Sequence, residues 1–239
     1  MRLLAVDTST LTGAVGLLDG GRAVAESRVN VAVTHGERLL AAIDALLRAA
    51  RWRLGDVEGF AVALGPGSFT GLRIGITTVK SLAFATGRPA VGVPTLDALA
   101  WMLPFCAFPV CPMLDARKGE VYAALYRTQD GRLETLAAAR AIAPAALAEE
   151  LARDVATPIV FLGDGVATCV PALAAALGPR ARLAPGSLRV SSGLAVAELG
   201  AEALGRGEMA DPAALVPIYL RPSEAELARE RRVGADTAH

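Results

Sequence analysis

The chain is poor in the residues that build metal centres and catalytic pairs. Its 239 residues include two histidines, His35 and His239, and three cysteines, Cys106, Cys111 and Cys169. The cysteines stand in apolar surroundings, lack the paired spacing of a zinc site and are odd in number, so they indicate no disulfide framework. We expect no metal site, and a Ser–His or Cys–His catalytic pair would have to use His35.

The chain also has no net charge and no long hydrophobic run. Lys and Arg total 24, Asp and Glu total 24, and the zero balance gives no overall field that would attract a polyanion such as RNA. Hydrophobic residues make up 53% of the chain, but Gly, Pro and charged residues interrupt them. No window reaches the roughly 18 apolar residues of a membrane span. Asp7 comes too early for a secretory signal, so we expect a cytoplasmic protein without a membrane partner.

The first hundred residues show β-prone runs and helical segments in the order strand, strand, strand, helix, strand, helix. Thr34 and Glu37 have the spacing of a capping box that begins the first helix, and Gly55 is expected to end it. Gly87 is expected to end the second helix in the same way. The expected elements, in order, are residues 2–8, 13–19, 22–29, 35–50, 57–64 and 70–86, followed by a short strand at 89–93 and a helix at 95–103.

The same order returns in the second half of the chain. Asp7 and Asp115 each end the first strand of their unit, and Gly65 and Gly163 each follow a buried strand, in AVALG and IVFLG. Two such local similarities, in the same order in both halves, indicate a duplicated βββαβα unit. We predict an α/β fold of two duplicated lobes, each with a mixed sheet flanked by helices. The predicted lobes are residues 1–104 and 105–239.

A strand that ends in Asp before a polar turn, present in both lobes, is the arrangement with which the actin-like ATPase fold binds a nucleotide. There the carboxylate holds Mg²⁺ and the amides of the turn face phosphate. Asp7, Thr8, Ser9, Thr10 and Asp115 therefore form the predicted site for ATP or ADP with Mg²⁺. The alternative is an Asp that caps its own turn at a degenerate site, in which case no cofactor is required.

The segment GPGSFTGLRIG, residues 65–75, is rich in glycine but fits neither of the usual catalytic loops. It does not end in Gly-Lys-Ser/Thr, so it is not a phosphate-binding P-loop, and Arg73 is its only cation. Pro66 and Thr70 occupy the positions where a nucleophile elbow around Ser68 would need glycines. We therefore expect a structural role, in which the glycines let a helix approach another backbone closely.

The two helices of the first lobe are apolar over more of their surface than a half-exposed helix requires. In helix 70–86 the charged residues Arg73 and Lys80 share one edge, while Gly71 and Gly75 share one side. Helix 35–50 has an apolar arc of about 180°, wider than the stripe of about 100° that faces a single core. Both helices are either packed within the chain or placed against a protein partner.

Several segments resemble the TsaB (YeaZ) family. They are GPGSFTGLRIG, the N-terminal DTST, the helix start VTHGERLLAAI, GVPTLDALA after the second helix, and PIYLRPSEAEL near the C-terminus. The resemblance implies an actin-like, ribonuclease-H-type fold and a role in tRNA N6-threonylcarbamoyladenosine (t6A) modification. It implies binding to the catalytic paralogue TsaD, with the ATPase TsaE also in the assembly, and contact with tRNA only through that complex. We expect a homodimer when TsaD is absent.

The resemblance implies that the two helices of the first lobe form the docking face. The expected interface residues are His35, Glu37, Arg38, Leu39, Ala42, Ile43, Leu46, Gly71, Leu72, Arg73, Gly75, Ile76, Val79 and Lys80.

The chain departs from TsaD-like enzymes at one point that bears on catalysis. Those enzymes carry His-x-x-x-His on the first long helix, a spacing that places two imidazoles on one helical face for a metal. Here the fourth residue after His35 is Leu39, so the chain is expected to have no catalytic residue of its own. The rival is an autonomous ATPase or phosphotransferase that uses Asp7 and Asp115, or a glycoprotease-type peptidase. The missing histidine argues against the peptidase.

Overall fold

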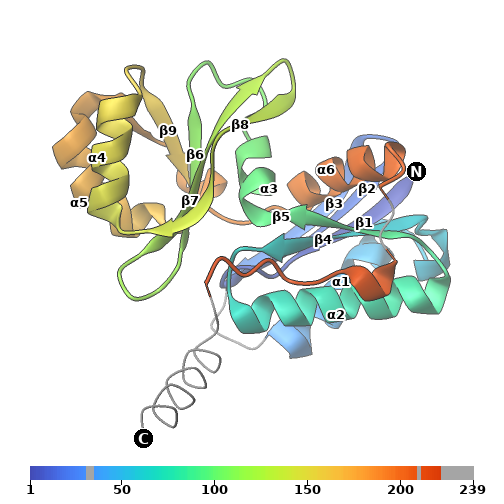
Figure 1. The fold of residues 1–239 in the computed structure, drawn as a ribbon. Coiled ribbons are helices and arrows are strands. Elements are labelled where there is room, and N and C mark those ends of the chain that lie inside the picture. Colours follow the sequence, from blue (N-terminus) through green and yellow to red (C-terminus); the bar gives the residue numbers. More distant parts are fainter. Residues whose placement is uncertain (31–34, 209–210, 222–239) are drawn as a thin grey trace, which may run out of the picture.

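Two five-stranded sheets with helices on their faces make up the structure (Figure 1). It is a computed structural model that describes residues 1–30, 35–208 and 211–221. The first sheet has the order β3-β2-β1-β4-β5 and the second β10-β9-β6-β7-β8. The strands are β1 (Arg2–Asp7), β2 (Thr12–Asp19), β3 (Arg22–Asn30), β4 (Gly59–Gly65), β5 (Ala90–Pro94), β6 (Val110–Asp115), β7 (Val121–Gln129), β8 (Arg132–Ile142), β9 (Ile159–Leu162) and β10 (Ala181–Leu183).

The helices repeat in the two halves of the chain as the sequence predicts. They are α1 (His35–Ala49), α2 (Phe69–Thr86), α3 (Thr95–Trp101), α4 (Pro144–Asp154), α5 (Val166–Leu177) and α6 (Gly193–Gly205). The unit β1β2β3α1β4α2 returns as β6β7β8α4β9α5. In both units the first strand pairs antiparallel with the second and parallel with the fourth. This confirms the predicted fold of two duplicated lobes with mixed sheets.

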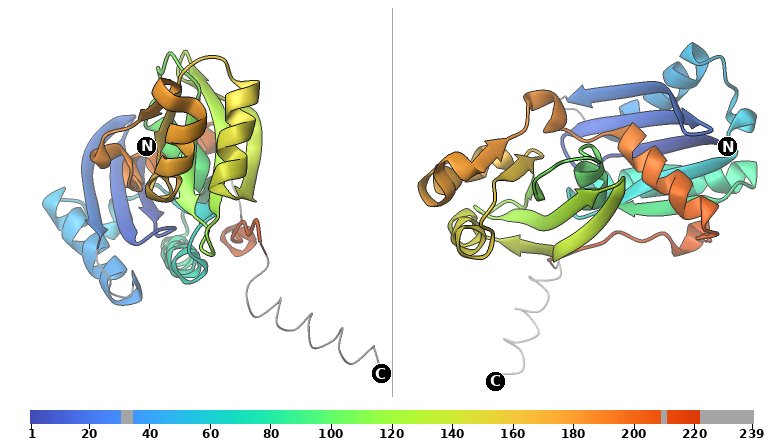
Figure 2. Two further views of the ribbon diagram at one scale, coloured as in Figure 1. Left: turned by 90° about the vertical axis from the view of Figure 1, so that its left-hand side faces the viewer. Right: turned by 90° about the horizontal axis from the view of Figure 1, so that it is seen from above.

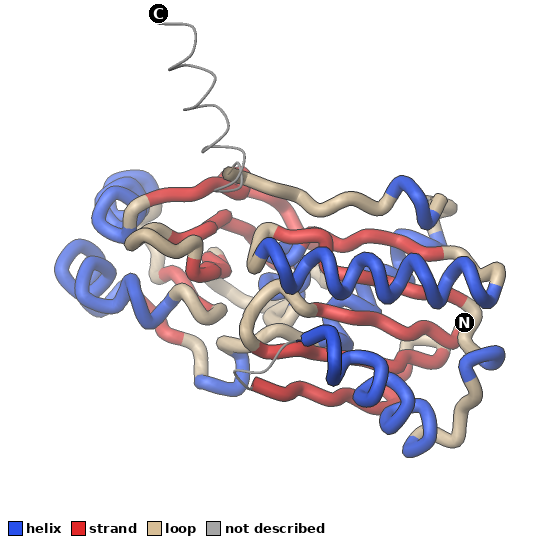
Figure 3. Tube along the Cα trace, turned by 90° about the horizontal axis from the view of Figure 1, so that it is seen from below, coloured by secondary structure: helices blue, strands red, loops and turns tan. Residues whose placement is uncertain are grey.

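Alternate side chains of the first sheet enter two different cores, because successive residues of a strand point to opposite faces. Leu4 and Val6 pack with α1 and α2, whereas Leu3 and Ala5 pack with α6. Helices α1 and α2 therefore cover one face of the sheet and α6 covers the other, as Figures 1 and 3 show. The position of α1 and α2 is set by this common core.

The second sheet is covered in the same way. Cys111 and Met113 pack with α4 and α5, and the alternate residues Val110 and Leu114 pack with α3. Figure 2 shows α4 and α5 together on the outer side of this sheet. Each lobe is therefore a sheet between two layers of helix.

Two helices cross from one lobe to the other, so packing does not follow the predicted division at residue 104. Leu96 and Leu99 of α3, which precede that boundary, lie in the core of the second sheet. In turn α6 packs on the first sheet, where a Cβ added to Gly16 of β2 would lie 2.4 Å from the carbonyl carbon of Gly193. The boundary describes the order of the strands, but α3 packs on the second sheet and α6 packs on the first.

Both α1 and α2 are followed by a residue in the left-handed conformation, and the sequence predicted that residue correctly only for α2. Helix α2 ends before Gly87, whose φ is 65°, as expected. Helix α1 ends at Ala49, one residue before the predicted end at residue 50, but the left-handed residue that follows it is Arg51, with φ of 57°, rather than Gly55. The N–H of Trp52 then donates to the Leu47 carbonyl at 2.9 Å, which closes the helix end. The capping residue predicted at the start of α1, Thr34, lies outside the described residues.

Two polar contacts fix α3 at the centre of the molecule. The Tyr126 hydroxyl of β7 donates to Asp97 Oδ1 at 2.7 Å, and the Trp101 indole donates to Glu198 Oε2 of α6 at 2.7 Å. Burial raises the pKa of Asp97, and the hydrogen bond from Tyr126 opposes that rise in part. Protonated Asp97 is therefore favoured in the folded chain relative to the unfolded chain.

This shift in the pKa of Asp97 predicts a pH dependence. A carboxyl whose pKa is raised on folding contributes stability at low pH and loses it as pH rises through the folded pKa. Asp97→Asn keeps the acceptor for Tyr126 and removes the titration. The free energy of unfolding is measured by urea denaturation at about pH 4 and at about pH 7. Its decrease from the lower to the higher pH should be smaller in the variant than in the parent.

Asp130→Asn is the matched control, because Asp130 is exposed in the β7–β8 turn. It should leave the difference between the two pH values unchanged. An Asp97→Asn variant with the same pH dependence as the parent would show that Asp97 does not titrate differently on folding.

Candidate functional site

The segment between Gly65 and Gly75 lies directly on the end of β1. A Cβ added to Gly67 would lie 2.4 Å from the carbonyl oxygen of Ser9, and one added to Gly71 would lie 2.0 Å from that of Thr8. The Ser68 N–H donates to the Ser9 carbonyl at 2.6 Å, and the Thr8 hydroxyl donates to the Gly71 carbonyl at 2.7 Å. The glycines thus allow the close backbone approach that the sequence predicts, and the backbone approached belongs to the same chain.

Ser68 begins the helix that makes this contact. Its side-chain oxygen accepts a hydrogen bond from the Gly71 N–H at 3.3 Å, which satisfies one of the free donors in the first turn of α2. The hydroxyl is therefore an N-cap, in agreement with the absence of a nucleophile elbow in the sequence.

The turn after β1, where a nucleotide was predicted, is covered by this contact. Asp7, Thr8, Ser9 and Thr10 are at most 9% exposed. Asp7 Oδ1 accepts a hydrogen bond from the Ser9 N–H at 2.8 Å, and the Thr10 hydroxyl lies 3.2 Å from that of Ser191. The carboxylate caps its own turn, and the following residues of that turn, Thr8 and Ser9, lie against Gly71 and Gly67. Nucleotide binding by these four residues remains a prediction.

The corresponding turn of the second lobe has the same local geometry but is open. Asp115 Oδ1 accepts from the Arg117 N–H at 2.8 Å, which matches the bond from Ser9 to Asp7, yet Asp115 is exposed. The Asp115 N–H donates in turn to Oδ1 of Asp164, whose pKa is raised by burial. The structure therefore repeats the strand-end Asp in both lobes and covers only the first.

The predicted interface residues divide into a buried and an exposed group. Ala42 is half-buried, Arg38 is exposed, and His35 and Glu37 are the first and third residues of α1. Six apolar residues of the set lie in the core of the first lobe and are unavailable on its surface, because they pack against the sheet. They are Leu39, Ile43, Leu46, Leu72, Ile76 and Val79. Gly71 and Gly75 face Thr8 of their own chain.

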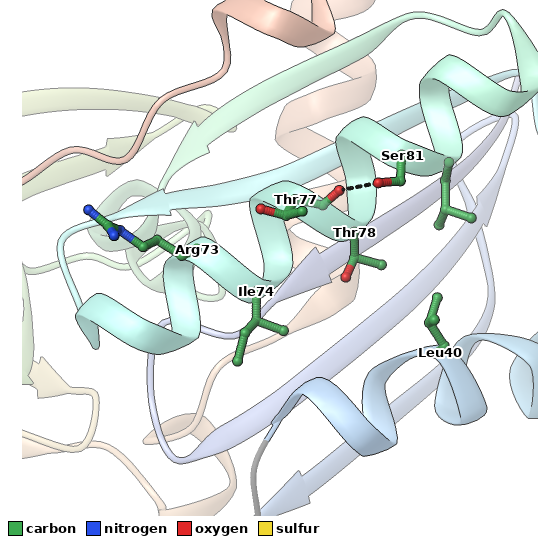
Figure 4. A pocket seen from close by; sticks show the side chains of 7 residues that line it. Leu40, Arg73, Ile74, Thr77, Thr78 and Ser81 are labelled. Carbon is green, nitrogen blue, oxygen red and sulfur yellow. Dashed lines mark hydrogen bonds between the residues drawn. The ribbon is translucent and has the colours of Figure 1, made fainter.

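The exposed side of α1 and α2 forms a shallow groove that the sequence analysis did not identify. Its volume is about 410 Å³. Ile74 and Thr78 of α2 point toward α1, and Leu40, which is 57% exposed, projects from α1 to meet them (Figure 4). The groove is lined by Leu40, Arg73, Ile74, Thr77, Thr78, Ser81 and Leu82. The spacing of apolar residues in the sequence could not distinguish the exposed Leu40 from its buried neighbour Leu39, because both lie within the apolar arc of α1.

Arg73 and Lys80 do not form the free charged edge that the sequence suggested. Arg73 Nε donates to the Tyr219 hydroxyl at 3.1 Å, and Lys80 Nζ donates to the Ala213 carbonyl at 2.9 Å. Both partners belong to the C-terminal segment that runs beside α2 (Figure 3). Reversing these charges would therefore disturb the chain itself as well as any partner.

Within residues 1–30, 35–208 and 211–221, no three His, Cys, Asp or Glu side chains come together so that they could hold a metal ion. No helix among them is long and apolar enough to span a membrane.

The sequence matches one family model and several curated proteins over much of its length. The model described as TsaD, tRNA N6-adenosine threonylcarbamoyltransferase, matches residues 29–229. The tRNA threonylcarbamoyladenosine biosynthesis protein TsaB of Bacillus subtilis is 33% identical over 95% of this chain and 96% of its own length. The Escherichia coli protein of the same name is 37% identical over 54% of this chain and 57% of its own length.

Solved structures agree with this assignment. YeaZ from Pseudomonas aeruginosa superposes with a TM-score of 0.76 at 32% identity, covering 92% of this chain and 99% of that one. Component A of (R)-2-hydroxyglutaryl-CoA dehydratase from Acidaminococcus fermentans, at 11% identity and a TM-score of 0.52, shares the fold alone. The duplicated lobes and strand-end turns are those of the actin-like α/β fold. The chain belongs to the TsaB (YeaZ) branch of the family that the TsaD model describes.

The contact between Gly71 and Thr8 predicts a loss of stability on adding one methyl group. Alanine is the better helix former, but in Gly71→Ala the new Cβ would meet a backbone oxygen that has little room to move. Overpacking of this kind should lower the free energy of unfolding by about 2–3 kcal/mol, measured by denaturant titration.

Gly205→Ala is the matched helical control, because nothing lies within 4 Å of a Cβ added at Gly205. It should change stability by no more than about 1 kcal/mol, in the stabilising direction. Equal stability of the two variants would mean that α2 does not rest on the β1 turn.

Proposed function

We propose that the chain is a non-catalytic subunit of tRNA threonylcarbamoyladenosine biosynthesis that binds the catalytic paralogue TsaD through α1 and α2. The proposal rests on the groove between these helices, where Leu40 and Ile74 are accessible on the surface of a lobe whose own core is already filled. An apolar surface of this kind, rimmed by hydroxyl groups, is typical of a protein interaction site.

The surface of α2 extends the docking face toward the C-terminal end of that helix. Thr77, Ser81 and Phe84 follow one another at helical spacing of three and four residues, and Phe84 is 88% exposed. A partner helix placed along the groove would cover Leu40, Ile74 and this side of α2 together. Packing of two helices from each chain then gives a four-helix contact.

The family and the sequence together support a non-catalytic role. The position four residues after His35, where a TsaD-like enzyme has its second histidine, is occupied by Leu39, and Leu39 is buried in the core. Asp7, the carboxylate on which an autonomous ATPase would depend, is 1% exposed, and the next two residues, Thr8 and Ser9, lie against Gly71 and Gly67. We therefore assign the transfer of the threonylcarbamoyl group to TsaD.

The remaining partners of the proposed assembly follow from the same resemblance. TsaE binds the complex of the two paralogues, and tRNA is bound by the assembly rather than by this chain, whose net charge is zero. Without TsaD, the groove closes against a second copy of the chain, because a paralogous partner and a second copy offer similar helices.

The proposal is tested by reconstitution with the TsaD of the same organism. The purified chain and TsaD should coelute from gel filtration at a mass above either alone. With tRNA, an activated threonylcarbamoyl donor, TsaE and ATP supplied, t6A should form only when both the chain and TsaD are present. The rival function predicts that the purified chain hydrolyses ATP without TsaD and loses that activity in Asp7→Ala. This second result would overturn the assignment of a non-catalytic subunit.

A charge placed in the groove should separate binding from folding. Leu40→Glu should lower the affinity for TsaD at least about tenfold, because the carboxylate would lose its water without gaining a partner. Thermal unfolding of the isolated variant should be close to that of the parent, since Leu40 is 57% exposed. Affinity is measured by calorimetry.

Leu136→Glu is the matched control. Leu136 is 37% exposed on β8 in the other lobe, so the same substitution there should leave the affinity unchanged. Parent-like binding by Leu40→Glu would exclude the groove as the docking site.

A further inference from the structure

Residues 211–221, here called the strap, run in an extended path beside α2 after the chain has left α6. Figures 1 and 3 show the strap passing along α2 from the far end of the first lobe toward the second lobe. The strap starts with a short 3₁₀ turn, Pro212–Ala214, and its residue Leu215 is buried in the core with α1 and α2. It is therefore a packed element of the first lobe.

Side chains of α2 hold the strap at both ends of the helix. Lys80 binds the Ala213 carbonyl near one end, and Arg73 binds the Tyr219 hydroxyl near the other. The rings of Tyr219 and Phe69 stack with centroids 5.0 Å apart, and the Arg73 guanidinium lies 3.9 Å from the Phe69 ring centre. The first turn of α2 is thus held by a cluster of two rings and one cation.

The strap also contacts the end of β4, shortly before α2 begins. The Ile218 N–H donates to the Leu64 carbonyl at 2.7 Å, as an additional strand would at the end of β4. Gly65, with φ of 117°, lies so close that an added Cβ would be 2.6 Å from the Ile218 carbonyl oxygen. Only glycine fits this backbone conformation and this space.

The last described residue of the strap reaches the second lobe. Arg221 forms an ion pair with Glu120, and both side chains are partly buried, with exposures of 24% and 33%. Glu120 belongs to the turn between β6 and β7, where its N–H donates to the Arg117 carbonyl at 3.1 Å. This is the open turn that carries Asp115, so one segment contacts both the start of α2 and the strand-end turn of the other lobe.

We infer that the strap is a clamp that couples the two lobes: the ion pair of Arg221 with Glu120 holds the turn after β6 in place relative to the first turn of α2. Separation of the lobes at this end requires the ion pair to break. Without the ion pair, the strap is no longer held to the second lobe beyond Tyr219, so the stack of Tyr219 on Phe69 is weaker. The N-terminal turn of α2 then unfolds locally more often. This coupling is independent of the proposed partner.

Hydrogen exchange on the full-length isolated chain tests the clamp. In Arg221→Glu and in Glu120→Arg, the amides of residues 69–75 should exchange about threefold to tenfold faster than in the parent, since the lost contact is partly buried. The double variant, which restores the pair with reversed charges, should return the exchange to near the parent rate. Amides of α4, which is far from the strap, serve as the internal reference.

Two further variants keep the test specific. Arg206→Glu reverses an exposed Arg that pairs with Glu208 beyond α6, and it should leave residues 69–75 unchanged. Tyr219→Ala removes the stack and should accelerate exchange at residues 69–75 even with the ion pair intact. Unchanged exchange at residues 69–75 in Arg221→Glu, whatever Tyr219→Ala does, would overturn the clamp, as would a double charge variant that exchanges faster than either single variant.

Discussion

The rest of the structure depends on the close contact between the start of α2 and the end of β1. Because Gly67 and Gly71 have no side chains, the helix rests directly on the carbonyl oxygens of Ser9 and Thr8. This contact covers the DTST turn and sets the distance between the start of α2 and the sheet. The groove against α1 lies on the outer side of the same helix, so its shape follows from the glycines beneath it. A surface feature is in this way set by a backbone contact in the interior.

The turns that follow β1 and β6 have the same local geometry, but one is buried and the other is exposed. Asp7 and Asp115 each accept a hydrogen bond from the N–H two residues later, at the same distance of 2.8 Å. Asp7 is buried in a turn whose Thr8 and Ser9 lie against Gly71 and Gly67, while Asp115 is exposed and faces Arg117. The strand-end carboxylate alone therefore does not define a nucleotide site. What covers the turn decides whether a ligand has access to it, and here the cover of the first turn is the helix proposed to bind a partner.

The two lobes are joined by helices that pack on the sheet of the opposite half of the chain and contact each other. Helix α3 packs on the second sheet and α6 on the first, and the indole of Trp101 links the two helices through Glu198. The strap adds a third connection at the end of the molecule where the strand-end turns lie. Relative movement of the lobes would have to disturb apolar packing at the centre and the ion pair of Arg221 at the edge, so the two regions are mechanically linked.

The sequence by itself determined the elements, their duplicated order and the family, because these depend on local signals. Gly87 marks the C-terminal end of α2, and the glycine spacing predicts a close approach. Only the tertiary structure decided what is approached and which side of each helix is free. Apolar residues such as Ile43 and Leu40 look alike in one helix, and the first is buried only because the sheet lies beneath it. The roles of Arg73 and Lys80 were equally hidden, since the strap that binds them is more than 130 residues away along the chain. A local pattern records how much of a helix is apolar, whereas burial depends on which distant segment comes to lie against it.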